Sequence, residues 1–201
     1  MKILITGFEP FGGEAVNPSW EAVKRLPDTV AGADLVKLRL PTSFSHARDV
    51  LEDAIQALRP DAVLSVGQAG GRAAVTVERV AVNLADARIP DNDGWQPVDE
   101  PLEPDGPTAY FATVPVKKIA ENIQAHGIPC QVSNTAGTYV CNAVLYCALY
   151  LTATEYPNLR AGFLHVPYSL EQAAQKTTAV PSMSLETMTQ ALRLAIETMA
   201  S

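Results

Sequence analysis

Basic residues are few in this chain, and long hydrophobic runs are missing. Lys and Arg number 15 against 22 Asp and Glu, a formal net charge of −7, and no basic cluster stands out. Nucleic acid and anionic membranes are therefore not expected as partners. Gly and Pro interrupt the apolar stretch in MKILITGFEPFGG after a few residues, too soon for a signal peptide or a membrane span.

Cysteine is also scarce. The three cysteines, Cys130, Cys141 and Cys147, cannot all pair, and without an export signal they indicate free thiols in a reducing, cytoplasmic location. The composition itself is that of a globular protein, with 47% apolar and 18% charged residues. A chain of 201 residues can build one substantial core, and we expect a single domain over residues 1–201.

Short apolar runs alternate with amphipathic segments along the chain. The apolar runs predict buried strands at 2–6, 33–40, 61–67, 73–84, 129–133 and 161–167. The amphipathic segments predict helices at 17–26, 44–58, 115–126, from 141 onward, and 184–200. This alternation favours an α/β fold, a three-layer α/β/α sandwich around a mostly parallel twisted sheet.

Ligands of such sheets bind beyond the carboxyl ends of the strands, which here lead into the loops 7–16, 67–72 and 134–141. The segment 86–108 is crowded with Pro, Asp and Gly. A run of that length without secondary structure is unusual inside a compact domain. We therefore expect it to act partly as a substrate-covering loop.

Cys141 is placed differently from the other two cysteines. In TAGTYVCNAVLY a turn precedes it and an apolar helix follows, so unpaired backbone N–H groups are expected to point at its sulfur and stabilise a thiolate. Cys130 lies in an apolar strand, and Cys147 faces roughly the opposite side of the helix, so both are interpreted as core thiols. On position alone, an inert buried thiol remains the commoner case for Cys141 too.

A nucleophilic thiol needs a base, and His165 ends a strand where α/β sites form. His46 falls between the apolar positions of its predicted helix, which indicates a solvated side chain. His126 ends another helix, where a capping role is sufficient. His165 is thus the candidate base.

Glu78 is the candidate carboxylate for orienting that base. It shares a mostly apolar strand face with Thr76, where a carboxylate is costly unless it is paired. A structural salt bridge to Arg72 or Arg88 explains the residue equally well. We find no zinc-ligand spacing, no phosphate loop and no dinucleotide-binding motif.

Several longer blocks stand in a fixed order between residue 4 and about residue 172. They are TGFEPFGG with NPSWEAV, VGQAGGR followed by VERVAVNLADARIPDN, AGTYVCN, and GFLHVPY. Together they resemble the pyroglutamyl-peptidase I (pyrrolidone-carboxylate peptidase) family. The resemblance implies a cytoplasmic cysteine exopeptidase, commonly a homotetramer, that uses no metal or other cofactor. Such an enzyme removes N-terminal pyroglutamate from peptides through a thioacyl-enzyme intermediate, and its Glu/Cys/His triad falls on Glu78, Cys141 and His165.

The same matching assigns eight residues to the pyroglutamyl pocket and its polar edge. They are Phe8, Phe11, Thr42, Gln68, Arg88, Ile89, Tyr139 and Val140. The sequence departs from the family pattern at two positions. Tyr139 stands where Phe is common and adds a hydroxyl, and Ala143 stands where His is common.

Two functions of other classes remain open from the residues. A nucleoside phosphorylase uses a similar sheet, but it requires phosphate-binding groups, and release of free base from a nucleoside and phosphate would identify it. A non-catalytic binding protein would not need the intact Glu78, Cys141 and His165, and a burst of product in a peptidase assay would exclude it.

Overall fold

The computed structural model describes residues 1–201, and its centre is a seven-stranded sheet. In spatial order the strands are β2 (Thr29–Val30), β3 (Ala33–Leu40), β1 (Lys2–Phe8), β4 (Ala62–Gln68), β9 (Arg160–Val166), β5 (Val75–Glu78) and β8 (Cys130–Ser133). β3, β1, β4 and β9 run parallel to one another. β5 is antiparallel to β9 and parallel to β8, and β2 is antiparallel to β3. The prediction of a mostly parallel sheet is confirmed.

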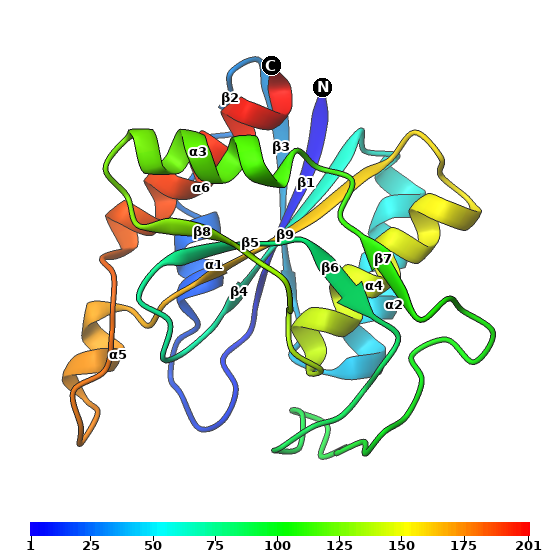
Figure 1. Cartoon of the computed structure of the whole chain (residues 1–201), viewed down its shortest axis with the longest axis horizontal. Helices are drawn as coiled ribbons and strands as arrows, with labels where there is room; N and C mark the ends of the chain where they lie inside the picture. The colour runs from blue at the N-terminus through cyan, green and yellow to red at the C-terminus, as the bar shows by residue number, and fades with distance from the viewer.

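Helices cover both faces of this sheet (Figure 1). One face carries α1 (Pro18–Val23), α3 (Val116–Ala125) and α6 (Leu185–Ala200), and the other carries α2 (Phe44–Leu58) and α4 (Val140–Thr154). Strand side chains alternate between two apolar cores, so that Ile3 and Ile5 enter one and Leu4 enters the other. The cores contain 29 and 25 buried residues, so each face is packed and the three-layer arrangement follows.

The helix starts follow from local sequence. The Asn17 side chain accepts from the Ser19 N–H, with proline at the first helical position of α1. Ser43 caps α2 and Ser184 caps α6 in the same way. α2 spans the predicted range 44–58, and its buried residues lie three and four positions apart.

The predicted strand at 73–84 is broken after Glu78. β6 (Val80–Val82) leaves the central sheet and pairs antiparallel with β7 (Ala109–Phe111) in a separate two-stranded sheet. The break lies at Arg79, whose N–H bonds to the Ser133 carbonyl in the central sheet while its own carbonyl accepts from Ala112. The short helix α5 (Leu170–Ala174) was not predicted, although its Ser169/Gln172 capping box is a readable signal.

The segment 86–108 contains no helix, and only an isolated bridge between Ala85 and Glu100 touches it. It is nevertheless bonded to its surroundings, since the Asp91 carboxylate accepts from the N–H groups of Phe44, Asp93 and Trp95. The Asn92 N–H also bonds to the Thr42 carbonyl. These bonds anchor part of the segment to the start of α2, and its role as a substrate-covering loop stays a prediction.

None of the helices is both long and apolar enough to cross a membrane.

Candidate active site

Cys141 is the second residue of α4, as the sequence predicts for the start of this helix. The residue before the helix, Tyr139, is extended and its side chain does not cap the first turn. The first N–H groups of a helix have no acceptor within it, so these donors are available to a ligand. Asn142 links the first turn of α4 to the chain at Val82 and Leu84. Its fully buried side chain accepts from the Val82 N–H and donates to the carbonyls of Val82 and Leu84.

The sulfur of Cys141 lies against the sheet. A Cβ added to Gly67 in β4 would be 2.7 Å from Sγ, so only glycine leaves space for the thiol there. Gly67 is also the register partner of His165 on β9. The sheet therefore brings the cysteine and the histidine to the same place.

Glu78 and His165 come together because β5 and β9 are antiparallel. Thr76 is the register partner of His165, so Glu78, two residues further along the same face, lies diagonal to the histidine. His165 Nδ1 lies 2.8 Å from Glu78 Oε1. Oε1 also accepts from Arg72 Nη1 at 2.6 Å and from the Thr76 hydroxyl at 3.1 Å. Glu78 thus bonds both to the histidine and to one of the two arginines that were considered as its partners from the sequence.

Burial sets the direction of the pKa shifts in this group. Burial opposes ionisation of Glu78, but its interactions with His165, and to a lesser degree with Arg72, outweigh this and hold the pKa of the carboxyl below its usual value. Burial lowers the pKa of His165 although Glu78 acts against it, so a neutral imidazole donates its Nδ1–H to the carboxylate. That hydrogen bond leaves Nε2 as the ring's proton acceptor.

The expectation of a resting thiolate is wrong for this site. Burial, and secondarily the Glu78 charge, raise the pKa of Cys141 to about 12. The helix start cannot offset the loss of water around a sulfur packed against Gly67. The thiol form is favoured at rest, and its proton must leave as the sulfur attacks.

Cys141 and His165 line a cleft of about 830 Å³. All eight residues expected at the pyroglutamyl pocket also line it: Phe8, Phe11, Thr42, Gln68, Arg88, Ile89, Tyr139 and Val140. Glu78 is fully buried behind His165 and does not reach the cleft surface.

Tyr139 joins two walls of the cleft. Its ring lies 6.1 Å from that of Phe11 and 5.3 Å, edge to face, from that of Phe44. The hydroxyl that distinguishes this sequence donates to the Pro90 carbonyl at 3.0 Å. The extra group therefore ties the 86–108 segment to the start of α4.

Sequence reasoning did not select three further polar residues of the cleft. Glu14, Tyr168 and Lys176 line it, and Lys176 pairs with Glu14 and lies 5.0 Å above the Tyr168 ring. These residues come from the 9–17 loop and from the stretch around α5, which lie far apart in sequence. Only the fold brings them together.

The remaining cysteines and histidines lie elsewhere. Cys130 and Cys147 are buried in the two cores, as predicted. His46 is exposed and pairs with Asp93, and His126 bonds to the Asn122 carbonyl at the end of α3. No group of three or more His, Cys, Asp or Glu side chains is arranged to hold a metal ion.

Comparison with known proteins gives the family. The model of the family described as pyroglutamyl peptidase matches residues 1–201. This chain belongs to the pyroglutamyl peptidase family. The pyrrolidone-carboxylate peptidase of Levilactobacillus brevis is 56% identical over 98% of this chain and 96% of its own length. That of Thermococcus kodakarensis is 54% identical over 98% and 95% of the two chains.

Solved structures of pyroglutamyl peptidases agree with this assignment. The pyroglutamyl peptidase I of Bacillus amyloliquefaciens superimposes with a TM-score of 0.96 at 50% identity, covering 99% of this chain and 94% of the other. The pyrrolidone carboxyl peptidase of Thermococcus litoralis gives a TM-score of 0.95 at 42% identity, covering 98% and 92%. The chain is therefore a hydrolase of the cysteine peptidase class.

Proposed function

We propose that this chain is an omega exopeptidase that hydrolyses the bond after an N-terminal pyroglutamyl residue of peptides. The observation that supports this most is the grouping of Cys141 and His165 in one cleft, with Glu78 bonded to His165 from behind. Membership of the pyroglutamyl peptidase family supplies the substrate.

Proton transfer starts the proposed reaction. As the Cys141 sulfur attacks the carbonyl carbon of the pyroglutamyl bond, its proton passes to Nε2 of His165, and Glu78 stabilises the imidazolium that forms. The N–H groups of the first turn of α4 donate to the oxyanion, and Arg88, which lines the same cleft, can assist them.

Collapse of the tetrahedral intermediate completes the first half. The C–N bond breaks, and the imidazolium gives its proton to the departing amine, which leaves a thioester on Cys141. A water molecule then attacks the thioester with His165 as base. Pyroglutamate is released and the thiol is restored.

The cleft's chemistry suits a flat, uncharged lactam. The rings of Phe8, Phe11 and Tyr139 offer apolar faces that can enclose it. The carbonyl of Gln68 already accepts from Gln172 at 3.1 Å, which leaves the Gln68 amide N–H groups to donate to the lactam carbonyl. A substrate without that carbonyl would leave the donors unpaired and be disfavoured.

The decisive assay compares a pyroglutamyl amide of a fluorescent amine with the matching prolyl amide. We expect release from the first and almost none from the second, with activity abolished by a thiol alkylator and in Cys141→Ala. Equal rates on the two amides would contradict the proposed pocket. Activity that survives in Cys141→Ala would contradict the proposed nucleophile.

We also propose a single catalytic domain over residues 1–201, a cytoplasmic location and a homotetramer. The three cysteines are free thiols, which suits a reducing compartment. The tetramer follows from the family resemblance. Light scattering of the purified chain would test it, and a monomer mass at micromolar concentration would contradict it.

A further inference from the structure

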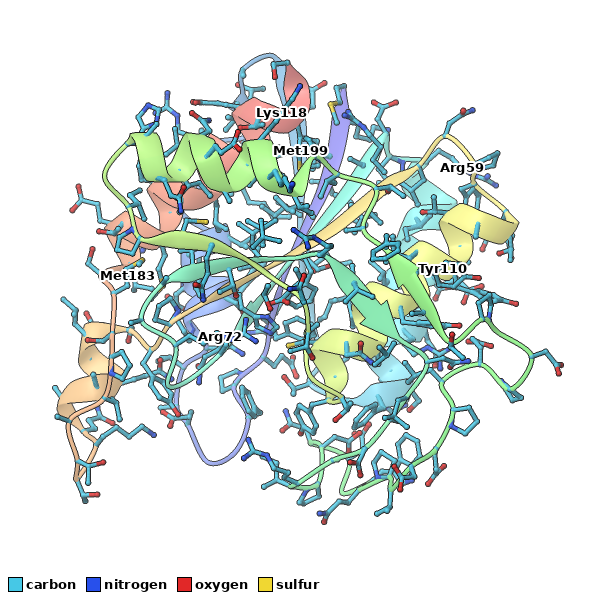
Figure 2. The ribbon with its side chains drawn as sticks, viewed as in Figure 1. Arg59, Arg72, Tyr110, Lys118, Met183 and Met199 are labelled. Atoms are coloured by element: carbon cyan, nitrogen blue, oxygen red, sulfur yellow. The ribbon has the colours of Figure 1, made fainter.

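Arg72 lies outside the three catalytic residues, yet it contacts the carboxylate among them. Its Nη1 donates to Glu78 Oε1 at 2.6 Å and also bonds to the Thr76 hydroxyl. Its Nη2 donates to the carbonyl of Thr135 at 3.2 Å, in the segment before α4. Figure 2 labels Arg72 in the loop that joins β4 to β5. One guanidinium thus links this loop, β5 and the approach to the nucleophile's helix.

The orientation of the Glu78 carboxylate depends on Arg72, because all of its hydrogen bonds are made by one of its two oxygens. Oε1 accepts from His165, Arg72 and Thr76, whereas Oε2 is buried without a hydrogen-bond partner. A fully buried carboxylate must obtain both its orientation and its charge compensation from the donors it has. Arg72 is the permanent cation among them.

We propose that Arg72 is a positioning residue for the reaction, whose guanidinium fixes the Glu78 carboxylate against His165 and balances its charge. The inference rests on the proposed function for its substrate. Among the cleft's charged and titratable groups, Arg72 is the one side chain besides His165 that bonds to Glu78. Those groups are Glu14, Arg72, Asp86, Arg88, Tyr139, Cys141, His165, Tyr168 and Lys176. On the neighbouring strand β8, the residue beside Glu78 is the uncharged Ser133.

The loop that carries Arg72 is shaped by its two glycines. Gly71 has a φ of +91°, a conformation that other residues rarely adopt. At Gly70 a Cβ would collide with the Tyr168 ring. The Arg72 N–H then closes a turn onto the Ala69 carbonyl at 3.2 Å. The AGG sequence thus folds the chain back so that the arginine reaches over β5.

The charge of Arg72 acts on both reacting groups. Burial is the main cause that lowers the pKa of His165, and the Arg72 charge lowers it further. Burial and Glu78 raise the pKa of Cys141, and Arg72 acts in the opposite direction. Loss of the arginine is therefore expected to raise the pKa of both groups.

Three substitutions separate positioning from other roles. Arg72→Met keeps an unbranched side chain but removes the charge and the donors, and Arg72→Lys restores the charge without the planar donor pair. Arg79→Met is the matched control, because Arg79 directly follows Glu78 and its side chain makes no hydrogen bond or ion pair.

On the pyroglutamyl amide, we expect kcat of Arg72→Met to fall by roughly ten- to a hundredfold with KM changed by less than about threefold, because orientation acts mainly on the transition state. Arg72→Lys should recover part of the loss, and Arg79→Met should match the parent. The acid limb of the kcat/KM profile should move to higher pH in Arg72→Met, since it reports the pKa of His165.

On the pyroglutamyl amide, two results would overturn the proposal: an unchanged kcat and pH profile, or a loss carried by KM alone, which would make Arg72 a substrate-binding residue. If Arg72→Met does not fold, Arg72→Lys and Thr76→Val decide by the same kcat and pH readouts.

A second measurement needs no substrate. The rate of Cys141 alkylation by iodoacetamide at pH 9 should fall in Arg72→Met relative to Arg79→Met. This comparison still holds if the parent protein does not cleave pyroglutamyl amides. Equal alkylation rates in the two variants would contradict the Arg72 assignment. That outcome is distinguishable from a failure of the proposed function, which would appear as no cleavage of pyroglutamyl amides.

Discussion

The sulfur of Cys141 occupies the space where a side chain on Gly67 would lie, at the point where β4 meets the start of α4. A Cβ built on Gly67 would lie 2.7 Å from Sγ and 2.9 Å from Cζ of Phe163, closer than real Cβ contacts. Gly67→Ala must therefore displace the thiol or the phenyl ring. We expect kcat/KM on the pyroglutamyl amide to fall by about a hundredfold, because a 1 Å misplacement of a reacting atom has an effect of that order.

Gly162→Ala is the matched control for Gly67→Ala. It crowds β9 at Val114, on the opposite face of the sheet from Cys141. It should lower the free energy of unfolding by about 1–3 kcal/mol, as overpacking does, while folded protein keeps its specific activity. Equal specific activities for the two variants would show that the contact at Gly67 has no catalytic consequence.

Glu78→Gln tests the orienting carboxylate. The amide oxygen can replace Oε1, so the fold should survive while the imidazolium loses its charged partner. We expect kcat to fall on the order of tenfold to a thousandfold, less than in Cys141→Ala, because orienting groups assist the chemistry rather than perform it. Unfolding of the variant with unchanged specific activity of the folded fraction would make Glu78 a structural residue.

Tyr139→Phe removes the hydroxyl that bonds to Pro90. Stability should fall by about 1 kcal/mol, the usual contribution of one hydrogen bond. Limited proteolysis within 86–108 should become faster, and a saturating pyroglutamyl inhibitor should reverse this. Tyr156→Phe is the control, because that hydroxyl makes no hydrogen bond, its ring packs against Arg59, and neither residue lines the cleft. Equal proteolysis of both variants would mean that the bond to Pro90 does not hold the segment.

The free energy of unfolding should be greatest between about pH 7 and pH 9. Below the ordinary His value of 6.5 the unfolded chain takes up a proton that buried His165, with its lowered pKa, does not, so stability falls on acidification. Glu78, whose pKa is also lowered, adds a second loss below 4.5.

On the alkaline side the sign reverses. Burial raises the pKa of Cys130 and Cys147 to about 11 and that of Cys141 to about 12, from 9.0 in the unfolded chain. Stability from these thiols is complete below pH 9 and is lost as the pH rises through the folded values. Urea denaturation across the pH range measures both limbs, and a flat profile from pH 5 to 11 would contradict the assignment.

The parts of the fold that local sequence determines could be predicted. α2 was placed correctly because its apolar spacing and its serine cap agree. The break at Arg79 could not be predicted, because the β-rich pattern continues through it and the departure of β6 depends on pairing with the distant β7.

The candidate site divides in the same way. Cys141 and His165 could be selected from their places at the ends of elements, and the structure brings them into one cleft. The sequence could not decide whether Glu78 pairs with His165 or with an arginine, since it cannot show that Arg72 and His165 converge on one oxygen. The thiol pKa was expected in the wrong direction, because the burial that raises it depends on tertiary packing, which places Gly67, more than seventy positions away, beside the sulfur.

The two cores have different relations to the cleft. None of the residues that line it belongs to the 29-residue core beneath α1, α3 and α6, whereas Phe8, Ala136 and Val140 belong to the other. Repacking under α6 can therefore change the melting temperature without replacing a cleft-lining side chain. Adaptation to heat and adaptation to a new substrate can proceed on opposite sides of one sheet, and an engineer can mutagenise the two sides independently.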